Sequence, residues 1–355
     1  MKKLSALLLA LALLFPAAGC AAPSPAPDTV SFTDSCGRTV ELPGKITRIA
    51  PSGGVAAMLL AIIAPDLLVT TAETPDPARS AYLPDEVAAL PATGQLYGGK
   101  STMNLEALLS AAPQVVIDLG EAKSDIAESL DALTEQTGIP SIFIDAGLGS
   151  MADAFRTLGT LLGRPERGEE LAAFVEETLT MAEANRAEIT EPVSVMYTGG
   201  AGGLNTNAAG SFHAQVLDIV GAENAVVLPD VSGKNGGNPI NMEQLYIFDP
   251  DVIVFSPEAP YREIASSPEW GELTAIRNGT FYLIPDRPYN WMGTPPSVNT
   301  LLGVWWLGAL VYPDVYDYDM TEAAQRIFRL LWGYELTDAE ARELLAESTE
   351  KAAAQ

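Results

Sequence analysis

The residue types that carry out covalent or metal chemistry are scarce in this sequence. Its 355 residues include a single histidine, His213, and two cysteines, Cys20 and Cys36. A zinc site with several histidine ligands and an iron–sulfur cluster both need more such side chains. The sequence also lacks paired carboxylates with a base beside them and the Ser-His-Asp order of a hydrolase triad. It therefore argues against an enzyme and predicts neither a resident cofactor nor a protein-held metal.

The lone histidine closes the segment Gly210-Ser211-Phe212-His213, in the first turn of a predicted helix. A histidine placed there can help bind an anion at the helix N-terminus or donate to a metal. A single histidine near a helix start is more often structural, so both interpretations stay open. Cys36 is expected to be a buried or partly buried thiol rather than a nucleophile, without a partner for an internal disulfide.

The segment from Arg287 to Met292 gathers side chains suited to holding a bulky small molecule. It follows a predicted strand and precedes two prolines and a helical pattern. Trp and Tyr give stiff stacking area, and Arg can pair with anionic oxygens through two parallel hydrogen bonds. We predict that these groups lie at a rim. The alternative is that Tyr289 and Trp291 pack between the body and the C-terminal helix.

Four glycines within residues 199–203 raise the question of a nucleotide site. The segment lacks the Gly-Lys-Ser/Thr ending of a phosphate-binding loop and the spacing of a dinucleotide turn. Close approach of the backbone to a ligand, or a flexible rim, explains these glycines better.

The first residues have the order of a secretory signal peptide. A basic start at Lys2 and Lys3 precedes an apolar run, residues 4–15, and a small-residue stretch that ends at Cys20. We predict a signal peptide over 1–19, a lipidated Cys20 and a Pro/Ala/Ser tether over 20–31 that holds the body at the outer face of the cell membrane. The alternative is an uncleaved signal anchor. The formal net charge of −26 argues against nucleic acid as a partner.

Short β-rich runs alternate with helical stretches through the remaining chain, and the pattern restarts near residue 193. The predicted strands cover residues 46–50, 67–71, 114–119, 141–145, 193–197, 251–255 and 280–284. The predicted helices cover residues 52–63, 124–136, 150–162, 211–220 and 297–311. Such alternation predicts an α/β fold with mainly parallel sheets in two Rossmann-like lobes.

Between the two halves, residues 165–189 are helical throughout, with Pro165 at the start and Pro192 beyond the end. At 1.5 Å per residue such a helix runs roughly 35 Å, about the diameter of a domain. We therefore predict an N-terminal lobe over 32–164, a stiff linking helix over 165–190 and a C-terminal lobe with terminal helices over 191–350.

A short pattern occurs once in each half. Asn104 and Glu106 precede the apolar run at 115–117, and Asn241 and Glu243 precede the run at 252–254 in the same spacing. Asn is a good helix N-cap and Glu in the first turn complements the helix dipole, so two similar helix starts explain the echo. A matched pair of exposed carboxylates, one in each lobe, explains it equally well.

Taken in order, these segments resemble the periplasmic binding proteins for vitamin B12, haem and ferric siderophores. The resemblance covers roughly residues 32–312, and the order and spacing of its segments carry it. These segments lie at residues 34–40, 42–43, 48–50, 104–117, 210–221 and 242–253. It implies that the protein delivers a metal chelate (a ferric siderophore, haem or cobalamin) to an ABC permease dimer with its ATPase subunits, as a monomer. It further implies that Glu106 and Glu243 face arginines on the two permease subunits.

The resemblance also implies that the ligand lies in the cleft between the lobes, held by loops at the carboxyl ends of strands. The residues of this sequence on those loops are Ser52, Tyr97, Lys100, Tyr197, Asn205, Thr206, His213, Arg287, Tyr289, Asn290 and Trp291.

Other ligands and functions remain as alternatives. An oxyanion such as molybdate or tungstate, or a nickel complex, could be bound by Arg287, His213 and loop amides. Bare zinc or manganese is disfavoured because the chain has one histidine. An exported enzyme, or a surface receptor that keeps only the fold, are the remaining alternatives.

Overall fold

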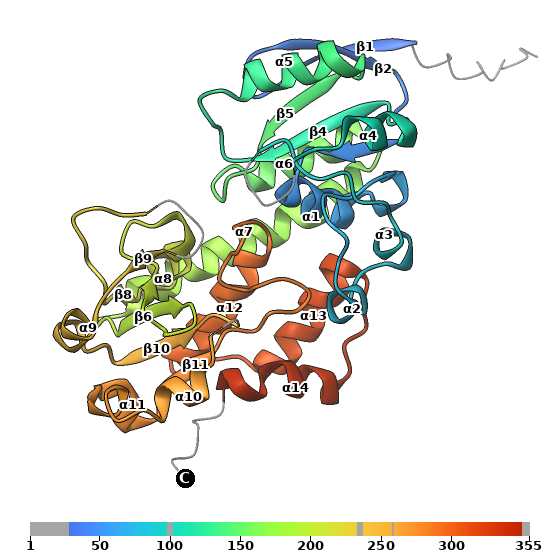
Figure 1. The fold of residues 1–355 in the computed structure, drawn as a ribbon. Coiled ribbons are helices and arrows are strands. Elements are labelled where there is room, and N and C mark those ends of the chain that lie inside the picture. Colours follow the sequence, from blue (N-terminus) through green and yellow to red (C-terminus); the bar gives the residue numbers. More distant parts are fainter. Residues whose placement is uncertain (1–27, 98–101, 233–236, 258, 350–355) are drawn as a thin grey trace, which may run out of the picture.

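The computed structural model describes residues 28–97, 102–232, 237–257 and 259–349. They form two α/β bodies joined by one long helix, α7 (Pro165–Glu188), as Figure 1 shows. The predicted fold class, two α/β lobes with a helical link, is confirmed. No helix in the described ranges is both long and apolar enough to cross a bilayer.

The N-terminal body is built on a three-stranded parallel sheet. Its strands lie in the order β3 (Ile49–Pro51), β4 (Val115–Gly120) and β5 (Ser141–Asp145). Residues 115–119 of β4 are all buried, as expected for a parallel strand that is covered on both faces. The covering elements are α1 (Gly54–Ile63), η1 (Pro65–Leu67), α2 (Pro77–Ser80), α3 (Asp85–Ala88), α4 (Leu105–Ala111), α5 (Ile126–Thr137) and α6 (Met151–Leu161).

Three sequence predictions in this body need correction. The strand β1 (Thr29–Thr33) pairs with β2 (Thr39–Pro43), so residues 29–31 belong to the folded body rather than to a tether. Residues 67–71 form no strand, because only Leu68 bridges Ile49 and the preceding residues turn as a 3-10 helix. The thiol of Cys36 is exposed, not buried, because it lies in the turn between β1 and β2.

The C-terminal body holds a six-stranded mixed sheet. The strand order is β11 (Phe281–Leu283), β10 (Val252–Phe255), β6 (Ser194–Gly199), β7 (Asn205–Thr206) and β9 (Asn238–Pro239), with β8 (Glu223–Asn224) also pairing with β6. Pairs involving β7 are antiparallel and the others are parallel. The helical elements are η2 (Phe212–Ala214), α8 (Gln215–Val220), α9 (Met242–Phe248), α10 (Tyr261–Ala265), η3 (Trp270–Glu272), α11 (Thr274–Asn278), α12 (Asn299–Val311), α13 (Met320–Trp332) and α14 (Asp338–Thr349).

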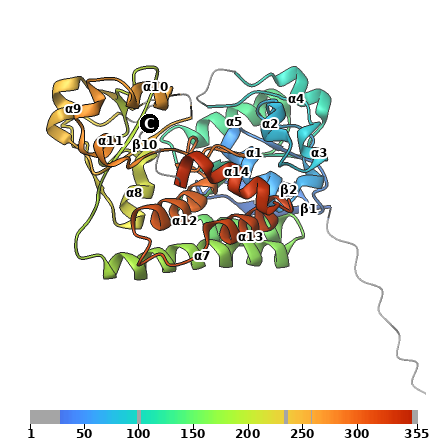
Figure 2. The same cartoon turned by 90° about the horizontal axis from the view of Figure 1, so that it is seen from below.

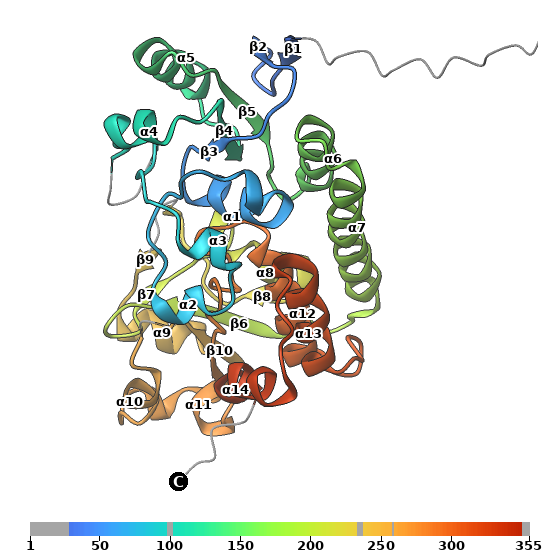
Figure 3. The ribbon, with the colours of Figure 1, turned by 90° about the vertical axis from the view of Figure 1, so that its right-hand side faces the viewer.

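The linking helix packs along both bodies (Figure 3). Leu171, Phe174, Val175 and Ala182 form its buried stripe, at helical spacing. At 24 residues it is about 36 Å long. The indole Nε1 of Trp305 on α12 donates to the Thr178 hydroxyl at 3.0 Å, and both side chains are buried. The helix is therefore held by the C-terminal body along its side as well as by chain connection.

A second connection between the bodies comes from the C-terminal helices. The guanidinium of Arg167 on α7 donates to the carbonyl of Ile62 in α1 at 3.2 Å and to that of Leu330 in α13 at 2.5 Å. The ring of Tyr82, in the N-terminal body, lies 5.6 Å from that of Phe328 and 5.0 Å from that of Tyr334. Helices α12 and α13 lie against α7 in Figure 2. The terminal helices, predicted as part of the C-terminal lobe, thus also contact the N-terminal body.

The close contact between α6 and α7 depends on two glycines that face each other, Gly159 of α6 and Gly168 of α7. A Cβ added at Gly168 would lie 2.6 Å from the carbonyl oxygen of Phe155. We expect Gly168→Ala to lower the free energy of unfolding by roughly 1–3 kcal/mol, because the helix backbones must move apart. Gly149→Ala is the matched control, since its Cβ meets nothing within 4 Å and should change stability by less than about 0.5 kcal/mol. Chemical denaturation measures both. Equal stability of the two variants would contradict a tight α6–α7 contact.

Candidate functional site

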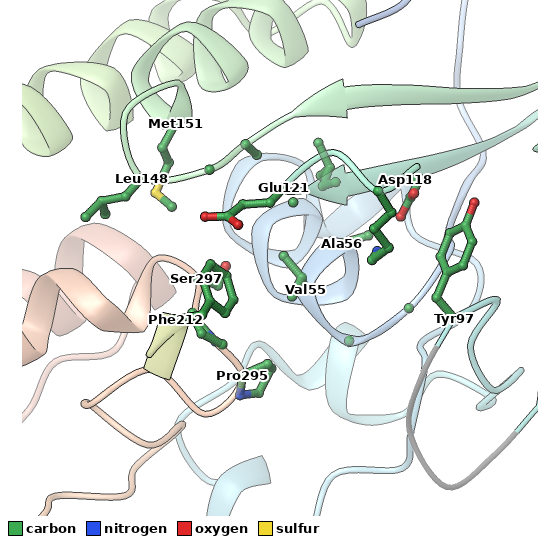
Figure 4. A pocket seen from close by; sticks show the side chains of 18 of the residues that line it. Val55, Ala56, Tyr97, Asp118, Glu121, Leu148, Met151, Phe212, Pro295 and Ser297 are labelled. Carbon is green, nitrogen blue, oxygen red and sulfur yellow. The ribbon is translucent and has the colours of Figure 1, made fainter. Parts of the chain in front are cut away.

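A cavity of about 470 Å³ lies between the two bodies. One wall comes from the carboxyl ends of β3, β4 and β5, and the other from η2, the start of α8 and residues 295–300 before and in α12. Figure 4 shows the side chains that line it. Loops at the carboxyl ends of parallel strands are where open α/β sheets bind ligands. The geometry therefore marks this cavity as the candidate binding site.

The N-terminal wall combines a buried carboxylate with a phenol and an amine. Ser52, directly after β3, donates its hydroxyl to Oδ1 of Asp118 on β4. Tyr97 donates to the carbonyl of Ile126 at 3.2 Å, and the Lys123 ammonium lies 4.4 Å from the centre of the Tyr97 ring. Burial raises the pKa of Tyr97 to about 12, so its phenol stays protonated at neutral pH.

Asp118 is the most deeply buried acidic residue in the lining of the cavity. Only 3% of the residue is exposed, and among the described residues its Oδ2 has no hydrogen-bond partner. Burial raises the pKa of this carboxyl, opposed by the Ser52 hydrogen bond and by the charge of Lys123. Glu121 stands nearby on the loop after β4. Burial raises its pKa too, while a hydrogen bond with Gln215 of the other body lowers it.

The C-terminal wall is mostly apolar, with hydroxyl groups at its base. Phe212 and Pro295 face the cavity in Figure 4. His213 also lines it, 8% exposed, with Nδ1 at 3.3 Å from the carbonyl oxygen of Gly293. The hydroxyls of Ser297 and Thr300 are buried and have no partner among the described residues. These two hydroxyls are available for hydrogen bonds with a ligand in the cavity.

A second, polar cavity of about 350 Å³ lies at the carboxyl ends of β6 and β10. Three residues predicted to touch the ligand, Tyr197, Asn205 and Asn290, line this cavity and not the first. Asn207 and Ser256 join them, each with a buried polar atom that lacks a partner among the described residues. The predicted site residues that line a cavity are thus divided between these two.

The aromatic and cationic rim predicted at residues 287–291 is not observed. Trp291 is completely buried, packs on Phe328 and donates its indole N–H to the Arg287 carbonyl at 2.9 Å. Tyr289 lies under the Arg79 guanidinium, 5.0 Å from ring centre to Cζ, and beside Trp332. The alternative, packing against the C-terminal helices, is therefore the arrangement found, because it buries both rings and satisfies the indole N–H.

The other predicted contacts are placed as follows. Ser52, Tyr97 and His213 line the inter-lobe cavity, and their contact with a ligand stays a prediction. The Arg287 side chain forms an ion pair with Asp286 at 3.2 Å and lines neither cavity. Thr206 is buried and donates its hydroxyl to the Asn238 carbonyl at 3.3 Å. Lys100 lies outside the described residues.

Sequence reasoning missed Asp118 and Glu121. A signal was present: an acidic residue interrupts the otherwise apolar run of β4, two positions before the strand ends. A carboxylate inside a strand that is buried on both faces needs a compensating partner, and near the strand's carboxyl end a ligand is a natural candidate.

The two matched carboxylates stand on two similar helices. Glu106 in α4 and Glu243 in α9 are both exposed in the first turn, and neither pairs with a basic side chain in the part of the chain that is described. Asn104 and Asn241 cap these helices by accepting from Ala107 N–H at 3.0 Å and Gln244 N–H at 2.9 Å. Figures 2 and 3 place α4 and α9 on the face opposite α7.

Comparisons with known proteins agree on one family. A family model described as periplasmic binding protein matches residues 49–288. A solved ABC transporter solute-binding protein from Sulfurospirillum deleyianum is 26% identical, with a TM-score of 0.81 over 89% of this chain and 99% of that one. A periplasmic solute-binding protein from Veillonella parvula is 23% identical, with a TM-score of 0.73 over 90% and 98%. The molybdate-binding protein MolA of Haemophilus influenzae is 22% identical over 63% of this chain and 68% of its own.

The burial of Asp118 has a measurable cost. Because its pKa is raised in the folded state, folding favours the protonated form. Stability therefore falls as the pH rises from the ordinary aspartate pKa through the raised one, and the loss is complete above it. We expect Asp118→Asn to raise the melting temperature at neutral pH by roughly 1–5 °C.

The gain should shrink as the pH is lowered from 7 to about 4, the ordinary range of an aspartate pKa, because the wild-type carboxyl, whose pKa is raised, takes up its proton before that range is reached. Calorimetry at the two pH values measures the difference in melting temperature between variant and wild type. The exposed Asp125→Asn is the control for the loss of charge alone. A melting temperature below that of the wild type at neutral pH would contradict this account of Asp118.

Proposed function

We propose that this chain, which belongs to the periplasmic binding protein family, captures an organic metal chelate between its two lobes. Membership makes the chain a substrate-binding protein of an ABC importer, a transport protein that acts outside the cytoplasm. Relatives of this kind bind small ligands and work with a permease and an ATPase. The chelate is the part that we propose for this chain.

The observation that carries the proposal is the size and lining of the inter-lobe cavity. A volume of about 470 Å³ lies within the range of pockets for organic molecules. Apolar side chains from both bodies face it, with a few polar groups between them. The apolar ones include Val55, Leu148, Met151 and Phe212 (Figure 4). A ligand with an organic shell can fill this space and contact both walls.

The likeness to MolA favours a second candidate, an oxyanion such as molybdate. An oxyanion needs a compact nest of donors and positive charge. The cavity instead contains the carboxylates of Asp118 and Glu121, with Lys123 as the cation on the same wall. Repulsion from two carboxylates weighs against a small dianion, so the chelate is the better supported ligand.

Calorimetric titration tests the ligand class. We expect binding of at least one organic chelate, tried as a ferric hydroxamate siderophore, haemin and cyanocobalamin, and not of molybdate. Ala122→Trp, on an exposed part of the cavity lining, should weaken this binding at least tenfold by occupying the entrance. Ala184→Trp, on the exposed side of α7, should bind as the wild type does. A heat of binding with molybdate and with none of the chelates would favour an oxyanion as the ligand.

We also propose that Glu106 and Glu243 dock the loaded protein onto the permease. Each stands beside an exposed apolar side chain on its own helix: Leu109, 47% exposed, on α4 and Ile247, 80% exposed, on α9. A carboxylate with an adjacent apolar anchor, repeated on both lobes and on one face, suits a partner that has two similar subunits with basic contact sites.

Charge reversal separates docking from ligand binding. The double variant Glu106→Lys with Glu243→Lys should reduce uptake into cells or proteoliposomes at least tenfold, while the affinity for the ligand stays within about twofold. Reversal of two exposed carboxylates on α7, Glu183→Lys with Glu188→Lys, is the matched control and should leave uptake unchanged. An equal loss of ligand affinity in the first variant would place its carboxylates in the binding site instead.

Attachment to the membrane through Cys20 remains part of the proposal. The signal peptide over 1–19, Cys20 and the tether up to residue 27 lie outside the described residues. The body starts at β1, so the tether would hold it on the side of the hairpin β1–β2. Metabolic labelling with a radioactive fatty acid, lost in Cys20→Ala, is the direct check. A monomer is expected for the protein.

A further inference from the structure

Asp118 restricts which ligand groups can bind in the cavity, in addition to the restriction that the shape of the cavity sets. Its Oδ1 accepts from the Ser52 hydroxyl, and its Oδ2 has no partner in the part of the chain that the structure describes. With only 3% of the residue exposed, bulk water does not compensate for the missing bond. Since no described residue donates to this oxygen, a ligand in the cavity that Asp118 lines can supply the donor.

The described side chains around Asp118 do not supply that donor, and the Leu119 backbone N–H, which lowers the pKa of the carboxyl, lies outside hydrogen-bond geometry to Oδ2. The Lys123 ammonium lies over the Tyr97 ring, and the Tyr97 hydroxyl donates to the backbone of Ile126. Glu121, on the same loop as Lys123, is a second acceptor and adds negative charge. The two carboxylates of this wall therefore offer acceptors, and a ligand group that carries an N–H or O–H fits them best.

The remaining unpartnered groups suit the same kind of ligand. Ser297 and Thr300 at the base of the cavity have hydroxyls that both donate and accept. The neighbouring polar cavity adds the buried Asn207 and Ser256, whose unpartnered atoms pair readily with amides and hydroxyls. Both cavities are thus lined for a neutral or cationic hydrogen-bonding periphery and not for a dense negative charge.

We propose that Asp118 selects chelates whose organic shell carries amide, amine or hydroxyl donors. The inference rests on the proposed function and narrows its ligand. Cobalamin has amide side chains, and a ferric hydroxamate siderophore of the ferrioxamine type has amide N–H groups and an ammonium. Haem presents two propionate carboxylates at neutral pH, and molybdate presents four oxo groups, so both offer only acceptors to Asp118 and are rejected.

The exchange Asp118→Asn tests this selection. The amide keeps the size of the side chain and can still accept from Ser52, but it turns its NH₂ toward the ligand, where two donors then face each other. Binding of the preferred amide-bearing chelate should weaken roughly 10- to 100-fold, the range for a lost hydrogen bond to a charged group. Binding of haemin should be unchanged or improve. Asp125→Asn, an exposed carboxylate outside the cavity, is the matched control.

Calorimetry with cyanocobalamin, ferrioxamine B, haemin and molybdate on the wild type and the two variants distinguishes the outcomes. Preference for either amide-bearing chelate over haemin by at least tenfold, lost in Asp118→Asn while its melting temperature is not lowered, supports the inference. A preference for haemin, or an Asp118→Asn variant that binds like the wild type, overturns it and leaves the chelate function standing. Binding of molybdate alone, or of none of the four, overturns the proposed function together with the inference.

Discussion

The fixed separation of the two bodies is the constraint on which the binding site depends. The cavity exists because α7 holds the carboxyl ends of β3, β4 and β5 at one distance from η2 and α12. Arg167 reinforces this spacing, since one guanidinium donates to carbonyls of α1 and α13. Partly buried donors and acceptors of this kind are costly to separate, so opening the bodies would break bonds on both sides of the helix. The lobes are built for small adjustments rather than wide closure.

The sequence predicted the fold well because its elements are locally consistent. The strand at 141–145 and the start of the linking helix at residue 165 match the structure within one residue. An apolar run determines the first, and Pro165 followed by apolar residues at helical spacing determines the second, without help from distant residues. The prediction of a strand at 67–71 was wrong because its residues form only two isolated bridges, Leu68 to Ile49 and Thr71 to Ala92. Pairing between distant segments decided that outcome, and no local pattern contains it.

The binding site was predicted less well, for the same physical reason. Position along the chain placed Ser52, Tyr97 and His213 at strand and helix ends, and these do line the cavity. It could not tell that Trp291 turns inward to Phe328, because the direction of a side chain depends on packing with α13. Nor did it single out Asp118, whose significance comes from burial and from an oxygen without a partner. The family identity is confirmed, whereas the choice of ligand rests on tertiary contacts that a one-dimensional pattern does not record.

The contacts of the C-terminal helices also impose an order on folding. Phe328 and Tyr334 meet Tyr82 across about 250 residues of chain, so the N-terminal body completes this part of its surface only when the C-terminal helices have docked. Contacts this distant in sequence close late, because the loop entropy must first be offset by earlier structure. A chain in which α13 has not docked therefore leaves Tyr82 without these two aromatic contacts. Docking of the C-terminal helices is then the step that joins the surfaces of the two bodies.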